Sequence, residues 1–151
     1  MTGKTYDAFV EGETITHALR RTVTETDNLT FCVFTHNPQP LHLDAEYAAA
    51  TEFGRIVVNG LYTFSLMIGV SVGDTTLGTL VANLGYEAVT MPAPVFLGDT
   101  LHFQTTVVER RESRSRPNAG IVVFEHQAFN QRDELVCRCR RIALLQRAVA
   151  A

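Results

Sequence analysis

Lysine is scarce in this sequence and tryptophan is missing from it. Lys4 is the only lysine among 13 basic residues, so arginine supplies nearly all of the positive charge. The net charge is −3 at pH 7, which argues against a protein that binds nucleic acid through its overall charge. Arginine pairs well with phosphates and carboxylates, although arginines on an acidic protein are more often plain solvated surface.

Long apolar runs are also missing. No stretch approaches the roughly 20 apolar residues that a membrane span requires, and the first residues, MTGKTYD, lack the apolar core of a signal peptide. We therefore expect a cytoplasmic protein with no membrane partner. Of the three cysteines, Cys137 and Cys139 would share one face of a strand, and buried free thiols are expected. A Cys-X-Cys pair alone is a weak indication of a metal, and no metal site is expected.

The remaining composition is that of a folded protein. The chain has 151 residues, of which 46% are hydrophobic and 19% are charged. This length suits one domain over residues 1–151, and no internal repeat is visible.

The first part of the chain predicts a strand and then a helix. Residues 15–24 mix apolar and polar positions and indicate an early strand. Thr24 or Thr26 can cap a helix over about residues 27–34, whose apolar side chains predict a largely buried surface. The helix must end before Pro38, because the residue that precedes a proline avoids helical geometry.

Two more helices are expected before the strands begin. Asp44 starts a short one over residues 45–51. The segment at 61–70 is apolar nearly all round, which is typical of a helix buried inside a domain. The strand-like segments are 80–86, 101–110, 120–130 and 134–145. A buried helix followed by an antiparallel meander is an α+β layout.

The segment Thr35-His36-Asn37-Pro38-Gln39-Pro40-Leu41-His42 is the best candidate for a functional loop. Its two prolines stiffen the backbone, because each fixes its own φ angle. Four of its side chains can form hydrogen bonds or exchange protons: His36, Asn37, Gln39 and His42. A rigid loop with converging polar groups suits catalysis. From the residues alone, a structural turn with two solvent-facing histidines remains an alternative.

Three motifs in order resemble the MaoC-like hydratase family, which contains the (R)-specific enoyl-CoA hydratases and related dehydratases. The first is the loop just described, in which Thr35, Pro40, Leu41 and His42 match the family and Asp44, Tyr47 and Ala48 follow in step. The others are Asn59-Gly60 at the start of the apolar helix, where the family has His-Gly, and the segment from Pro94 to Leu101. The resemblance implies a single hot-dog domain, in which a curved antiparallel sheet wraps around a central apolar helix.

The loop departs from the family pattern at three positions. His36 replaces a glycine, Asn37 replaces the catalytic aspartate, and Gln39 replaces an asparagine. An amide can orient a water molecule but cannot take its proton. The role of general base therefore falls on His42, with His36 as a possible helper in binding.

This variant loop resembles a narrower branch of the family. That branch includes the mesaconyl-CoA hydratases and small hydratases associated with malyl-CoA or citramalyl-CoA lyase-like enzymes. The segments Val81 to Gly85 and Arg111 to Pro117 share the resemblance. It implies four- and five-carbon dicarboxylic acyl-CoA substrates, whose free carboxylate a fixed aspartate would repel and Asn37 would not.

The resemblance implies hydration or dehydration of an enoyl-CoA thioester, with coenzyme A as part of the substrate and no separate cofactor. The Gly60 amide would stabilise the enolate oxygen, although simple backbone packing is the alternative there. Asn59 would contact the substrate beside it. Arg114 and Arg116 are candidates for the phosphates of coenzyme A, and Arg55 for a substrate carboxylate; plain surface is the alternative for each.

The resemblance also implies a homodimer, or a dimer of dimers, with the site at the subunit junction. Two other functions stay open. A non-catalytic acyl-CoA-binding subunit would explain the loss of the aspartate at Asn37. A hot-dog acyl-CoA thioesterase would need a water-activating carboxylate, and the loop contains none.

Overall fold

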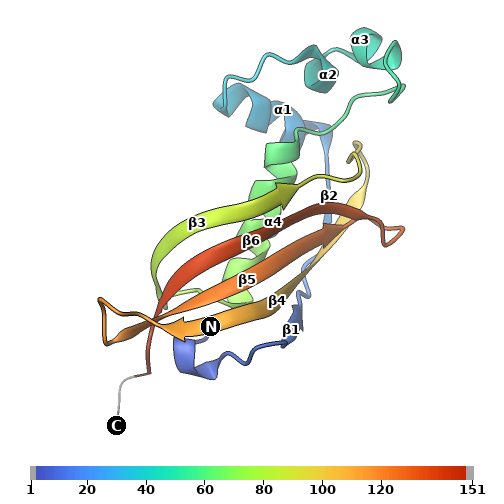
Figure 1. The fold of residues 1–151 in the computed structure, drawn as a ribbon. Helices are drawn as coiled ribbons and strands as arrows, with labels where there is room; N and C mark the ends of the chain where they lie inside the picture. Colours follow the sequence, from blue (N-terminus) through green and yellow to red (C-terminus); the bar gives the residue numbers. More distant parts are fainter. Residues whose placement is uncertain (1–2, 149–151) are drawn as a thin grey trace.

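The computed structural model describes residues 3–148, and its centre is one helix cradled by a curved antiparallel sheet (Figure 1). The helix is α4 (Gly60–Asp74). The sheet has the strand order β1-β4-β5-β6-β3, and β2 pairs with β4 off this path. The strands are β1 (Thr14–Thr16), β2 (Arg21–Thr22), β3 (Leu80–Thr90), β4 (Thr100–Glu112), β5 (Ala119–Phe129) and β6 (Leu135–Gln146). This is the predicted α+β hot-dog arrangement.

The three long strands β4, β5 and β6 form the predicted meander, within two residues of the expected bounds. Their inward positions are buried, as the alternating pattern requires; Leu101, Phe103 and Val107 on β4 are examples. β3 lies beside β6 at one edge of the sheet, although it precedes β4 in the chain. Buried free thiols are confirmed, and burial raises the pKa of Cys137 to about 11 and that of Cys139 to about 12.

The early strand predicted over residues 15–24 is wrong as one element. The chain forms the short strands β1 and β2 instead, and leaves the sheet between them. The strand register gives the reason: Thr16 pairs with Gln104 and Arg21 pairs with Leu101, so the four residues 17–20 face only the two residues 102–103 of β4. His17 still donates its amide to the Phe103 carbonyl on β4, and its buried side chain hydrogen-bonds Asp74 and Thr105.

The helix α1 (Glu25–Phe34) begins as predicted, with Thr24 as its N-cap in a capping box with Asp27. Its predicted burial is wrong: only Asn28 and Cys32 are buried, while Leu29, Val33 and Phe34 are 50%, 64% and 80% exposed. The buried residues form one stripe along the helix, and Phe31 is half-buried with its ring edge-on to Tyr62 on α4. The side chains of Leu29, Val33 and Phe34 face outward.

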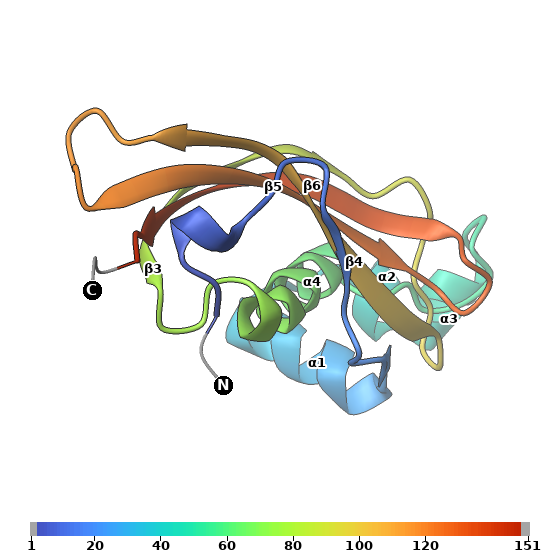
Figure 2. The same ribbon diagram turned by 90° about the horizontal axis from the view of Figure 1, so that it is seen from below.

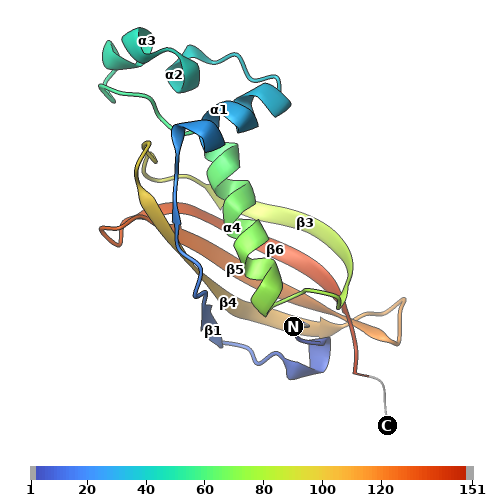
Figure 3. The ribbon, with the colours of Figure 1, turned by 180° about the vertical axis from the view of Figure 1, so that it is seen from behind.

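Two short helices, α2 (Pro40–Leu43) and α3 (Ala45–Ala49), complete the layer that α1 begins. α2 was not predicted, and it places His42 on a helical turn. Figure 3 shows the three helices together at the N-terminal end of α4. Figure 2 shows α1 on the side of α4 that faces away from the sheet.

The helix α4 confirms the predicted apolar helix and extends it to Asp74, but burial all round is wrong: Leu61 is 55% exposed. Its sheet-facing positions recur every four residues, at Thr63, Met67 and Ser71, and all three are buried. No helix within residues 3–148 is long and apolar enough to cross a membrane.

Candidate active site

His42 is held by a main-chain carbonyl. Pro40 at the first helical position starts the turn of α2, because its fixed φ suits that place. The Nδ1 atom of His42 lies 2.7 Å from the Val57 carbonyl oxygen. A carbonyl can only accept, so Nδ1 carries the proton and Nε2 keeps its lone pair. The neutral ring therefore presents a base.

Asn28 connects this histidine to the start of α4. Its side-chain Nδ2 donates to the His42 carbonyl at 2.9 Å, and its Oδ1 accepts from the Asn59 amide at 2.9 Å. Asn28 is buried within α1, so the bond to the Asn59 amide is shielded from water and the bond to the His42 carbonyl is partly shielded. One side chain thus fixes the backbone of two predicted site residues.

Asn59 is the N-cap of α4. Its Oδ1 accepts from the Leu61 amide, and its carbonyl accepts from the Tyr62 amide. The Gly60 amide is the first-turn N–H that has no acceptor among the described residues. A free amide at a helix N-terminus suits a developing oxyanion.

A side chain at position 60 would displace the end of the Met91 side chain. A Cβ built on Gly60 collides with the Sδ atom of Met91, which covers the start of the helix. Glycine therefore allows the Met91 side chain, which follows β3, to pack against the start of α4.

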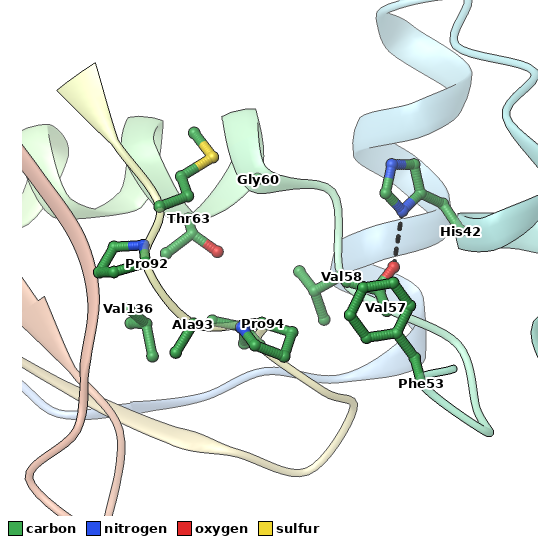
Figure 4. A pocket seen from close by; sticks show the side chains of 12 residues that line it. His42, Phe53, Val57, Val58, Gly60, Thr63, Pro92, Ala93, Pro94 and Val136 are labelled. Carbon is green, nitrogen blue, oxygen red and sulfur yellow. Dashed lines mark hydrogen bonds between the residues drawn. The ribbon is translucent and has the colours of Figure 1, made fainter. Parts of the chain in front are cut away.

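His42 and Gly60 line one cavity of about 340 Å³. In Figure 4 the His42 ring lies on one side of it, with Thr63 and Val136 on the other. The remaining wall comes mostly from two segments that flank the helix: Phe53, Val57, Val58, Met91, Pro92, Ala93, Pro94 and Val95. No acidic or basic side chain other than His42 is among these lining residues.

Asn37 lies in the turn between α1 and α2 and is not among the cavity-lining residues. Its Oδ1 accepts from the Gln39 amide at 3.0 Å, so the side chain shapes the loop. His36 before it is exposed, with a φ of 53°. That left-handed conformation favours glycine, which explains the residue that the family has there.

The three predicted arginines are not brought to the cavity wall in this chain. Arg55 is exposed, and its guanidinium lies 3.8 Å from the centre of the Phe96 ring. Arg114 and Arg116 are exposed in the turn between β4 and β5. Figures 1 and 3 place this turn at the end of the sheet opposite α2 and α3.

A second polar cluster lies at the other end of α4. The His17 ring joins Asp74 through Nδ1 at 2.7 Å and Thr105 through Nε2 at 2.8 Å. The Thr105 hydroxyl also lies 2.8 Å from Nδ1 of His126. Burial, with Arg141 and His17 nearby, lowers the pKa of His126 to about 3. This cluster is packed in the core.

Three contributors to the cavity region were missed from the sequence: Asn28, Thr63 and Met91. Asn28 had a usable signal, because it lies four residues before Cys32 on an otherwise apolar stripe of α1. Thr63 and Met91 carry no local signal, since only the folded chain brings them beside Gly60.

Comparisons with known proteins agree with this geometry. A family model described as "MaoC like domain" matches residues 8–128. The mesaconyl-CoA hydratase of Cereibacter sphaeroides is 34% identical over 134 residues, covering 89% of this chain and 38% of that protein. The β-methylmalyl-CoA dehydratase of Chloroflexus aurantiacus is 29% identical over 145 residues, covering 96% of this chain and 41% of that protein. The chain therefore spans about two fifths of the length of these relatives.

A solved structure of similar length also matches. It is described as a monoamine oxidase regulatory protein from Archaeoglobus fulgidus and is 32% identical, with a TM-score of 0.88. The match covers 99% of this chain and 98% of that one.

Proposed function

Since the chain belongs to the MaoC-like domain family, we propose that it adds or removes water at the double bond of an enoyl-CoA thioester. The observation that carries the proposal is the pairing of two free groups on one cavity. His42 offers Nε2 as a base, and Gly60 offers an amide to an oxyanion. Water addition to a conjugated thioester needs both.

The proposed reaction uses these groups in two steps. Nε2 of His42 takes a proton from water as the water oxygen bonds to the β-carbon. The electrons of the double bond move toward the thioester carbonyl, and the Gly60 amide donates to the resulting enolate oxygen. The enolate then collapses, and His42 returns the proton to the α-carbon. Dehydration follows the same path in reverse.

Asn37 has a supporting place in this scheme. Its Oδ1 already accepts from the Gln39 amide, but a carbonyl-type oxygen has a second lone pair that can hold a water molecule. Asn37 would orient the water, and His42 alone would move the proton.

We propose further that the substrate is a short dicarboxylic enoyl-CoA such as mesaconyl-CoA. Two observations support this. The loop has Asn37 where a carboxylate would repel a second acidic group, and no Asp or Glu is among the described residues lining the cavity. Two relatives are named for mesaconyl-CoA and β-methylmalyl-CoA, and the acyl groups of these compounds are dicarboxylic.

A homodimer, or a dimer of dimers, is the proposed assembly, in the cytoplasm. β3 is an edge strand whose exposed side chains include Leu84, Tyr86 and Val89. Val33 and Phe34 on α1 are exposed as well. A second copy would cover such apolar surface, and exposed edges are sites of pairing.

The substrate class is tested with crotonyl-CoA and mesaconyl-CoA, with loss of the conjugated thioester absorbance as the readout. The wild type is expected to prefer mesaconyl-CoA. Asn37→Asp is expected to lower kcat/KM for mesaconyl-CoA about tenfold more than for crotonyl-CoA, since it places like charges together. Equal effects on the two substrates would remove the charge argument for a dicarboxylic acyl group.

One observation favours a second function. Asn37 in place of the family's aspartate is also what a non-catalytic acyl-CoA-binding subunit would carry. That protein would bind coenzyme A esters without turnover, and His42→Ala would change nothing. A thioesterase would release free thiol instead, which a thiol reagent detects.

A further inference from the structure

The hydroxyl of Thr63 is a buried polar group on the cavity wall that the fold leaves without a partner. Thr63 is 2% exposed, and its Oγ1 makes no hydrogen bond. It lies one turn after Gly60 on α4 and lines the same cavity (Figure 4). An unpaired buried hydroxyl is unfavourable, so a partner is expected from outside the chain.

The same helix shows how such hydroxyls are normally satisfied. Ser71 donates to the Ile68 carbonyl, and Thr75 donates to the Ser71 carbonyl. Both bonds lie within the last turns of α4 or just beyond them. Thr63 makes no such bond, although the helix offers it the same kind of acceptor. Its hydroxyl is thus available to a ligand.

The position of Thr63 determines which part of a bound acyl thioester it can contact. Thr63 and Val136 are buried, whereas Met91 at the rim is 42% exposed. Coenzyme A is too large for 340 Å³ and must leave by the rim, so the far end of the acyl group reaches Thr63. Gly60 and Thr63 are separated by roughly 4.5 Å along the helix, a span that a short acyl group covers.

The surroundings favour an acceptor atom with negative charge. Thr63 lies near the N-terminal end of α4, where the helix dipole is positive, and no Asp or Glu is among the described residues of the wall. A hydroxyl can donate to an oxygen there. A methyl group would leave it unpaired.

We propose that Thr63 is a specificity-determining residue, whose hydroxyl donates a hydrogen bond to a carboxylate oxygen at the far end of a short acyl group. The assignment rests on the proposed function insofar as that function places an acyl thioester in this cavity. It goes further by naming the side chain that distinguishes a dicarboxylic acyl group from a hydrocarbon one.

The test compares succinyl-CoA with butyryl-CoA, in which a methyl group replaces the distal carboxylate. Neither has a double bond to hydrate, so calorimetric Kd values report binding alone. The wild type is expected to bind succinyl-CoA more tightly. Thr63→Val keeps the shape and removes the hydroxyl; it is expected to weaken succinyl-CoA about tenfold or more and to change butyryl-CoA less than about twofold. Thr63→Ser keeps the hydroxyl and should retain the preference.

Two outcomes would overturn the assignment: no wild-type preference for succinyl-CoA, or an equal change for both ligands in Thr63→Val. Absence of binding to either ligand would overturn the assignment, and absence of turnover of enoyl-CoA substrates as well would overturn the proposed function. Turnover is measured separately on enoyl-CoA substrates. A protein that hydrates them but shows no effect of Thr63→Val on ligand preference would keep the function and lose this inference.

Discussion

At the N-terminal end of α4, His42 bonds one carbonyl through Nδ1, and the hydroxyl of Thr63 bonds nothing. At the C-terminal end, His17 uses both ring nitrogens, and the Thr105 hydroxyl lies between His17 and His126. The two ends lie roughly 21 Å apart along the helix and use the same residue types.

This difference shows how to distinguish polar residues with a structural role from those with a candidate role in catalysis or binding. The C-terminal cluster links its hydroxyl and ring nitrogens to one another inside the core, so its members hold the helix against the sheet. The N-terminal groups are individually fixed but keep an atom free toward a cavity. Nε2 of His126 also has no partner, but it belongs to a fully buried side chain in the packed core, whereas Thr63 lines a cavity. Residue type alone cannot distinguish these roles, whereas the presence of an unused polar group on a cavity wall can.

The largest expected effects come from removing one hydrogen-bonding side chain at each end of α4. Asn28→Leu removes two buried hydrogen bonds beside His42 and is expected to cost about 2–4 kcal/mol of stability. Because the backbone of His42 loses its anchor, kcat per folded molecule should also fall about tenfold. Urea unfolding and kcat measurements check both values.

The matched change at the C-terminal end is Thr105→Val. It leaves Nε2 of His17 and Nδ1 of His126 without the hydroxyl that each of them contacts. It is expected to cost about 2–3 kcal/mol while kcat per folded molecule stays unchanged. If Thr105→Val slows turnover as much as Asn28→Leu does, the division between the two ends is mistaken.

A smaller effect concerns acid stability at the C-terminal end. The pKa of His126 is about 3 in the folded chain, against an ordinary value of 6.5. Between these values the unfolded chain binds the extra proton, so stability is fully present above pH 6.5 and is lost as the pH falls toward 3. The slope of the unfolding free energy between these pH values is about 1.4 kcal/mol per pH unit. His126→Gln should flatten the curve of unfolding free energy against pH, and an unchanged slope would contradict the assignment.

The smallest effect is expected at His36. His36→Gly relieves a left-handed backbone conformation and should stabilise the protein by about 0.5–1 kcal/mol, with kcat unchanged. Thermal unfolding and turnover measure this. A drop in kcat or a rise in KM would give His36 a place in substrate binding, which contradicts this expectation.

Much of the fold followed from periodicity. The α4 segment and the strands β4 to β6 are long and regular, so their patterns are strong. The edge position of β3 did not follow, because strand pairing is set by contacts distant in sequence. The burial of α1 was overestimated, since apolar residues such as Phe34 occur on a face that this chain does not cover.

The residues of the candidate site also divide into those that local sequence motifs predict and those that only the folded chain reveals. His42 and Gly60 were recognised because they belong to local motifs, and the fold brings them to one cavity. Asn28 and Thr63 act through neighbours that only the folded chain supplies. Arg114 and Arg116 were chosen by residue type, and the fold places them at the opposite end of the sheet.

The account is tested most directly by incubating mesaconyl-CoA and crotonyl-CoA with the protein in D₂O and analysing the products by mass spectrometry. The wild type should yield a hydroxyacyl-CoA with one non-exchangeable deuterium at the α-carbon, because His42 delivers a solvent-derived proton there. His42→Ala should reduce that product by about 10²-fold or more, while the control His102→Ala, on β4, should not. Unaltered substrate, free thiol, or equal turnover by wild type and His42→Ala would contradict a hydratase with His42 as its base.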